Sequence, residues 1–273
     1  MELRHTLYDV KDRVATITLN RPHRANAWTG TMHIEYRYLL QKADLNKEIG
    51  AIVVTGSGNF FCVGADTGGL SSFTETGKYD PGTAPDLVTP GSDEFPPFRN
   101  DYVYHFALTK PVISAMSGPA AGVGFVLACY TDVRFAVPGA KLTTAHGPIN
   151  LPAEYGLSWL LPRLIGGSRA IELLISSRKF LTEEAHEMGL IHRLVQREDL
   201  LQEAQAYAVD LIKRNSPESL RQSKRQTYLD YHRDVGTATL ESDQLLREMV
   251  TQPNYKRGID GLVNKTIPDW LRD

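Results

Sequence analysis

The chain has 273 residues, and its composition excludes several classes of protein. Hydrophobic residues make up 42% and charged residues 23%, which excludes a disordered chain and allows a sizeable buried core. Thirty basic and 32 acidic side chains leave a formal net charge of −2, so no overall field attracts nucleic acid or an anionic membrane. The length predicts one large α/β domain, or a core domain with a smaller appendage.

The two cysteines, Cys62 and Cys129, both lie in apolar stretches, as is typical of a reduced compartment and not of a disulfide framework. The first residues contain no apolar segment of the kind that directs secretion, and no apolar run reaches the roughly 20 residues that span a bilayer. We therefore expect a cytoplasmic protein. The histidines show no metal-ligand spacing, so no metal site is predicted.

The first half of the chain alternates strand and helix patterns. β-Branched residues over 14–19 predict a strand, and apolar residues recur at helical spacing from Ala27 through Ala43. The short apolar run over 51–55 predicts a strand buried on both faces. Residues 67–101 are rich in Gly, Pro, Ser, Thr and Asp and show no sustained period, which predicts a long loop.

Order is predicted to return with a strand over 112–116, an apolar helix ending near Tyr130 and a strand over 132–137. Three short helices follow over 157–165, 169–176 and 182–188, and beyond Glu198 the pattern is helical throughout. We place a boundary near residue 196. The predicted core covers 1–195, and a C-terminal helical domain that serves assembly covers 196–273.

Two segments share one design, in which a buried strand leads into a glycine-rich turn and then into the start of a helix. The strand at 52–55 leads to residues 63–66, and the strand at 112–115 leads to residues 118–124. Glycine leaves backbone N–H groups unobstructed, and a helix N-terminus adds positive partial charge to them. Brought together, the two turns could form an oxyanion hole, although tight packing alone also explains glycines after strands.

Taken together, five ordered stretches resemble the enoyl-CoA hydratase/isomerase (crotonase) superfamily. They are ITLNRPHRANAW, AIVVTGSGNFFCVGAD, KPVISAMSGPAAGVGFVLACYTDVRFA, EYGLSWLLPRLIGGSRAIELLISSRKFLTEEAHEMGLIHRLV and GIDGLVNKTIPDW. The resemblance implies an α/β fold, a spiral of ββα units with a C-terminal all-helical domain, assembled as a homotrimer or a dimer of trimers. It also implies an acyl-CoA substrate and no tightly bound cofactor, with coenzyme A present only as part of the substrate.

The resemblance assigns roles to individual residues. The backbone N–H groups of Ala65 and Val123 would polarise the thioester carbonyl. Arg24 and Ala25 fall where the family contacts coenzyme A, with a basic residue near its phosphates, and Lys265 falls where a neighbouring subunit's lysine reaches the nucleotide. The loop at 71–101 is expected to cover the acyl pocket.

The chain departs from the family where hydratases carry two glutamates that activate water, because Val126 and His146 stand at those positions. Valine accepts no proton, so the two-carboxylate mechanism cannot operate. His146 is one candidate acid or base, since imidazole exchanges protons near neutral pH. Glu154 is the other, because some members without the usual glutamates carry one here, although it could simply complement a helix start. A turn through Pro148 and Pro152 could return Glu154 or Tyr155 to His146.

Trp28 and His33, together with His146, also resemble the crotonase-type hydrolases of β-diketones, which break a carbon–carbon bond by a retro-Claisen route. The substrate pocket is predicted to be lined by Trp28, His33, Val126 and Tyr155. Trp28 and His33 share one face only if the helix begins after the tryptophan. Two alternatives to a CoA isomerase or hydratase remain open: a C–C hydrolase of β-diketones and a non-catalytic acyl-CoA binding protein. Asp66 is predicted to cap the helix that begins at 67 or 68.

Overall fold

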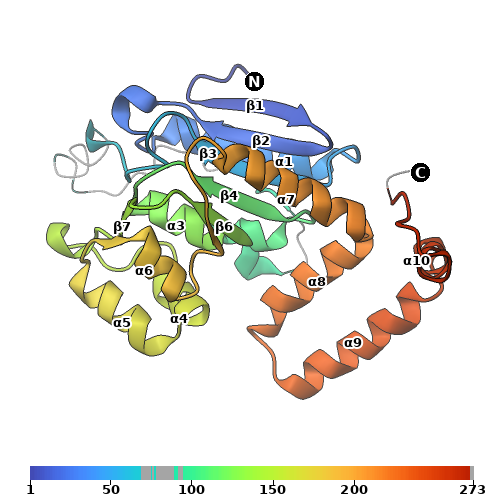
Figure 1. The fold of residues 1–273 in the computed structure, drawn as a ribbon. Coiled ribbons are helices and arrows are strands. Elements are labelled where there is room, and N and C mark those ends of the chain that lie inside the picture. Colours follow the sequence, from blue (N-terminus) through green and yellow to red (C-terminus); the bar gives the residue numbers. More distant parts are fainter. Residues whose placement is uncertain (69–74, 76, 78–88, 92–94, 271–273) are drawn as a thin grey trace.

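A central sheet of six strands organises the chain in the computed structural model, which describes residues 1–68, 75, 77, 89–91 and 95–270 (Figure 1). Its order is β1-β2-β3-β4-β6-β9, with β1 antiparallel to β2 and every other neighbouring pair parallel. Parallel pairs need crossover connections, and helices supply those between β2 and β3 and between β4 and β6. The strands are β1 (Thr6–Lys11), β2 (Val14–Leu19), β3 (Ala51–Gly56), β4 (Val112–Met116), β6 (Val133–Ala136) and β9 (Arg193–Leu194).

Helices cover both faces of this sheet, so β3 is buried on both sides. Alternate residues of a strand point to opposite faces. Val53 packs in one hydrophobic cluster with residues of α7 (Leu200–Arg214), while Ile52 and Val54 pack in another with residues of α1 (Gly30–Leu45) and α3 (Val123–Tyr130). This double burial confirms the predicted continuous apolar strand.

A second, smaller sheet consists of β5 (Ala120–Ala121), β7 (Lys141–Thr143) and β8 (Phe180–Leu181) in the order β5-β7-β8. β5 and β7 run parallel, with Ala121 opposite Thr143. Beside it lie α4 (Leu157–Ile165), α5 (Gly167–Ser176) and α6 (Thr182–Glu187), as Figure 1 shows. These helices confirm the three that the sequence predicts, within two residues at their ends.

Three more helices follow α7, of which α8 packs against the core through Leu229 and Tyr228. They are α8 (Pro217–Asp230), α9 (Val235–Met249) and α10 (Pro253–Asn264), and α10 lies on the far side of the molecule from β7 (Figure 1). α9 buries none of its side chains, and several of its apolar residues are exposed, among them Val235, Leu240 and Leu246. By contrast, α7 packs against the main sheet. The division at residue 196 stays a prediction.

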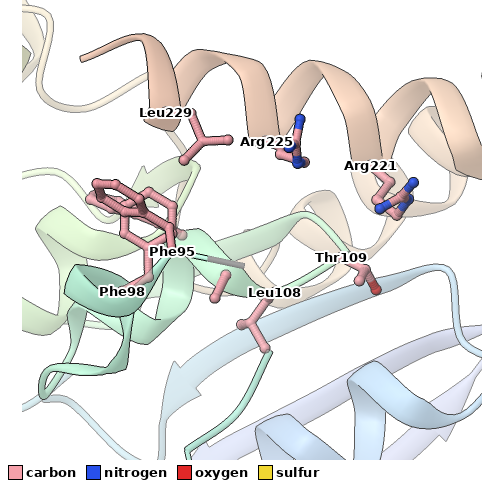
Figure 2. A pocket seen from close by; sticks show the side chains of 9 residues that line it. Phe95, Phe98, Leu108, Thr109, Arg221, Arg225 and Leu229 are labelled. Atoms are coloured by element: carbon pink, nitrogen blue, oxygen red, sulfur yellow. The ribbon is translucent and has the colours of Figure 1, made fainter. Parts of the chain in front are cut away.

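A small cavity lies where α8 meets the core (Figure 2). Its volume is about 30 Å³, and its lining includes Phe95, Phe98, Phe106, Arg225 and Leu229. That volume accommodates one or two water molecules and not an acyl group. The ring of Phe106 stacks on Tyr228 of α8 with centroids 3.8 Å apart, so α8 packs against the core in this region.

One sequence prediction of the fold needs correction, and another lies mostly outside the described residues. The first helix begins at Gly30 and not at Ala27, because Thr29 is its N-cap and accepts a hydrogen bond from Met32 N at 3.1 Å. Most of the predicted loop at 67–101 lies outside the described residues, as does most of the expected cover of the acyl pocket at 71–101. None of the described helices combines the length and apolar character that crossing a bilayer requires.

Candidate active site

Four segments lie side by side and end at one edge, where the candidate site is built. Isolated parallel bridges join Trp28 to Ala65 and Cys62 to Ala120, and β5 continues the pairing to β7. The segments at 25–28, 62–66, 119–122 and 141–144 are therefore neighbours that run in the same direction. Because parallel strands bring their carboxyl ends to the same edge, the residues that follow each segment converge there.

The first glycine turn presents the N–H group of Ala65. Trp28 donates its N–H to Gly64 O at 2.8 Å and accepts from Asp66 N at 2.9 Å. These bonds use the residues on either side of Ala65, so the N–H of Ala65 points away from Trp28, toward the side on which Cys62 pairs with Ala120. Within the described residues this N–H has no hydrogen-bond partner. Gly64 allows the turn because its φ of 104° suits glycine.

The second glycine turn presents the N–H group of Val123, the first residue of α3. N–H groups in the first turn of a helix have no partner within the helix. Gly122 precedes it with φ 48° and ψ −125° and donates to Thr143 O at 3.2 Å. A Cβ placed on Gly122 would lie only 3.8 Å from Gly64 Cα, so the two turns are in direct proximity. The sequence prediction that the turns come together is consistent with this packing.

Close packing also explains a third glycine. A Cβ on Gly124 would overlap the carbonyl oxygen of Cys62, whereas a Cβ on Gly167, in the first turn of α5, would meet no atom within 4 Å. We expect Gly124→Ala to lower the free energy of unfolding by about 1–3 kcal/mol or more, because it overpacks the contact between the turns. Gly167→Ala is the control and should be neutral or slightly stabilising. Chemical denaturation of both variants checks this, and equal stability would contradict it.

His146 and Glu154 lie beside the second turn, on the bend that follows β7. The bend is tight: Ala145 has φ 60°, and His146 O accepts from Ile149 N at 3.2 Å and from Leu151 N at 3.1 Å. Glu154 then ends the bend, with its carbonyl accepting from Leu157 N at 2.9 Å at the start of α4.

The environment of Glu154 changes its acidity. Its side chain is half-buried, and burial raises its pKa, while the neighbouring imidazole of His146 partly opposes that rise. The two groups are therefore close enough to interact electrostatically. His146 is itself buried. The burial of its carboxyl and the electrostatic influence of His146 make Glu154 a candidate proton acceptor on this bend.

Aromatic rings connect the first turn to this bend. The Trp28 ring lies 5.7 Å from His33 and 5.9 Å from Tyr102, and Tyr102 contacts Tyr155 edge to face at 4.7 Å. We call Trp28, His33, Tyr102 and Tyr155 the aromatic wall. Helix α1 begins after Trp28, which is the condition under which Trp28 and His33 share a face.

The remaining candidates occupy distinct places. Arg24 is exposed in the 3-10 turn Pro22–Arg24, four residues before Trp28, and Ala25 follows it with φ 51°. Val126 is buried in the first turn of α3. Lys265 is exposed at the C-terminal end of α10, a helix that lies far from α3 and β7 in Figure 1. Asp66 accepts from Gly68 N at 3.0 Å, as predicted for a cap, and pairs with Arg21 at 3.0 Å.

Asp101 and Tyr102 also contact the site, although the sequence did not predict them. Asp101 pairs with Arg37 at 2.8 Å and lies 3.6 Å from His33 Nε2, while Tyr102, with φ 65°, places its ring against His33. A positive φ is unusual for a large aromatic residue and marks a position that the surrounding packing enforces. The only signal in the sequence is the density of aromatic residues over 98–106. Within the described residues no group of His, Cys, Asp and Glu could hold a metal ion.

Fold and site together define an α/β protein whose candidate site combines backbone N–H groups with one half-buried carboxylate. The sequence model of the family described as enoyl-CoA hydratase/isomerase matches residues 9–273. The chain therefore belongs to the enoyl-CoA hydratase/isomerase family. This confirms the resemblance, and solved structures of that kind confirm the crotonase-like fold with a helical C-terminal region.

Individual relatives cover almost the whole chain. The 1,2-epoxyphenylacetyl-CoA isomerase of Escherichia coli is 32% identical over 97% of each protein. An enoyl-CoA hydratase/isomerase from Mycobacterium paratuberculosis has a similar structure, with a TM-score of 0.80, 28% identity and coverage of 98% of this chain and 99% of that one. An enoyl-CoA hydratase from Polaromonas sp. JS666 has a TM-score of 0.82 at 25% identity, covering 97% of this chain and 98% of that one.

Proposed function

We propose that the protein is an isomerase-type enzyme of acyl-CoA thioesters that moves one proton through an enolate. The N–H groups of Ala65 and Val123 hold the thioester oxygen, and Glu154 takes the proton. The observation that carries this proposal is the half-buried Glu154 with a raised pKa beside His146, on the bend next to the second glycine turn. The name of the E. coli relative, an acyl-CoA isomerase, supports it.

The reaction balances with one carboxylate. Glu154 accepts a proton from carbon adjacent to the thioester carbonyl, or conjugated with it, and the electron pair of that C–H bond moves onto the carbonyl oxygen. Two N–H donors aimed at this oxygen stabilise the enolate, and each is worth several kcal/mol in a site that excludes water. Glu154 then returns the proton to another carbon of the same acyl group. The double bond has moved, and the enzyme is unchanged.

His146 is the alternative proton acceptor, and as a neighbour of Glu154 it partly opposes the rise that burial causes in the pKa of that carboxyl. Arg24, which is exposed, and Ala25 are proposed to contact coenzyme A, with Arg24 near its phosphates. Because α10 lies far from α3 and β7 (Figure 1), Lys265 is proposed to act from a neighbouring subunit of a homotrimer or a dimer of trimers. We further propose a cytoplasmic location and no tightly bound cofactor.

One observation favours a second candidate, the C–C hydrolase of β-diketones. The rings of Trp28 and His33 lie beside each other, and the backbone of Trp28 pairs with Ala65, in keeping with the partial resemblance to those enzymes. Such an enzyme would act without coenzyme A. The non-catalytic acyl-CoA binding protein is the third outcome of the same test.

The decisive measurement is proton exchange in D₂O, followed by NMR, on saturated acyl-CoAs and on paired 2-enoyl- and 3-enoyl-CoAs, with a cyclic β-diketone assayed in parallel. We expect deuterium at the carbon next to the thioester and interconversion of the enoyl isomers, with slower hydration. Cleavage of the diketone without affinity for CoA esters would establish the hydrolase instead. Binding without exchange on any ester would leave only the binding protein.

A further inference from the structure

Two buried nitrogen atoms in the aromatic wall lack hydrogen-bond partners. Trp28 is 7% exposed and His33 is 2% exposed, and in the described part of the chain neither Trp28 Nε1 nor His33 Nε2 has a partner. A buried polar atom without a partner costs about 1–3 kcal/mol, so most such atoms in folded proteins are paired. Here the two belong to neighbouring rings, with centroids 5.7 Å apart.

The residues around His33 do not supply the missing partner. Asp101 Oδ1 is 3.6 Å from His33 Nε2, beyond hydrogen-bond range, and it already accepts from Arg37 at 2.8 Å. Burial lowers the pKa of His33 to about 4, although Asp101 opposes the effect and Arg37 adds to it. The imidazole is therefore neutral near pH 7. A neutral imidazole can donate through one nitrogen and accept through the other, whereas the indole N–H only donates.

The position of the two rings relates them to the acyl group. The backbone of Trp28 pairs with Ala65, whose N–H is proposed to hold the thioester oxygen. From Trp28 the aromatic wall continues through Tyr102 to Tyr155, the residue after Glu154. An acyl group that starts at Ala65 and presents a carbon to Glu154 therefore lies next to this wall.

We propose that Trp28 Nε1 and His33 Nε2 form a second oxygen-binding site, and that the substrate is an acyl-CoA with an additional keto, hydroxyl or ring oxygen in its acyl group. This inference rests on the proposed function and narrows its substrate class. A keto or ring oxygen accepts from the indole N–H and from Nε2–H of the imidazole, whereas a hydroxyl can also donate to an unprotonated Nε2. A hydrocarbon acyl chain would leave both nitrogen atoms buried and unpaired, and a site with unpaired polar groups discriminates strongly against such ligands.

The test compares matched ligands. Dissociation constants are measured by calorimetry for hexanoyl-CoA, 3-oxohexanoyl-CoA and 5-oxohexanoyl-CoA, all in a Glu154→Gln background that suppresses turnover. We expect at least one oxo ester to bind at least tenfold more tightly than hexanoyl-CoA. Trp28→Phe, which keeps the ring and removes the N–H, should reduce this preference to less than threefold. Trp159→Phe is the control, because that indole packs on Arg163, Tyr231 and His232, and it should retain the preference.

A second readout does not depend on the Trp28 variant being stable. In ¹H–¹⁵N spectra, the indole N–H resonance of Trp28, assigned by elimination with Trp159→Phe and Trp270→Phe, should move downfield with the preferred oxo ester and not with hexanoyl-CoA. Equal affinity for all three esters, or an unchanged preference in Trp28→Phe, would overturn the inference while leaving the proposed function intact. Absence of binding to every ester would overturn the proposed function itself.

Discussion

Replacing Glu154 with glutamine is expected to lower kcat for proton transfer by about 10²- to 10⁴-fold, the usual contribution of one general acid or base. Glutamine preserves the size and polarity of the side chain, so the Kd for acyl-CoA should change little. The loss follows because the carboxylate is the group that carries the proton between two carbons. Exchange kinetics in D₂O and calorimetric binding, measured on the same preparation, separate the two effects.

The direction in which the rate changes with pH is a second, independent test of Glu154 as the proton acceptor. Burial raises the pKa of Glu154, so its ionised fraction, and with it the rate of proton abstraction, should increase with pH through that raised value. In Glu154→Gln this limb of the profile should disappear, whereas His146→Gln should keep it. Glu187→Gln, at an exposed glutamate at the end of α6, is the matched control and should retain both rate and profile. If the rise of the rate with pH is lost only in His146→Gln, the proton acceptor is His146 and not Glu154.

The sequence predicted the main strands and short helices well because they carry strong local patterns. Val112–Met116 is an apolar run between a proline and a glycine turn, and β4 has those ends. β1 was missed because its TLYDVK sequence mixes exposed and apolar positions at a sheet edge. The strands β5, β8 and β9 have two residues each, too few for any period to appear, and only pairing with distant strands defines them.

The candidate site was predictable only in parts. Glycine spacing indicated two turns, since Gly64 and Gly122 need conformations that other residues avoid. The contact between these turns depends on segments more than 50 residues apart, which no local pattern reports. Asp101 and Tyr102 lay at the end of a stretch without period, so their approach to His33 could not be predicted. The unpaired nitrogen atoms of Trp28 and His33 are likewise a property of packing and not of residue type.

Proline at position 123 should remove one of the two oxyanion donors with little effect on the fold. Val123 is the first residue of α3, where proline is well tolerated, and its N–H makes no hydrogen bond within the described residues. The residue before a proline must be extended. Gly122, with φ 48° and ψ −125°, has the mirror image of such a conformation, which glycine adopts equally well.

Val123→Pro is therefore expected to lower kcat by about 10²- to 10³-fold, the effect of deleting one oxyanion-hole donor. Val123→Ala keeps the N–H while shortening the side chain, so it should lose much less activity and separates the donor from the packing of the valine. The two variants should unfold within a few degrees of each other. If Val123→Pro melts like the wild type and still exchanges protons at the wild-type rate, the enolate oxygen is held elsewhere, because a prolyl nitrogen has no hydrogen to donate.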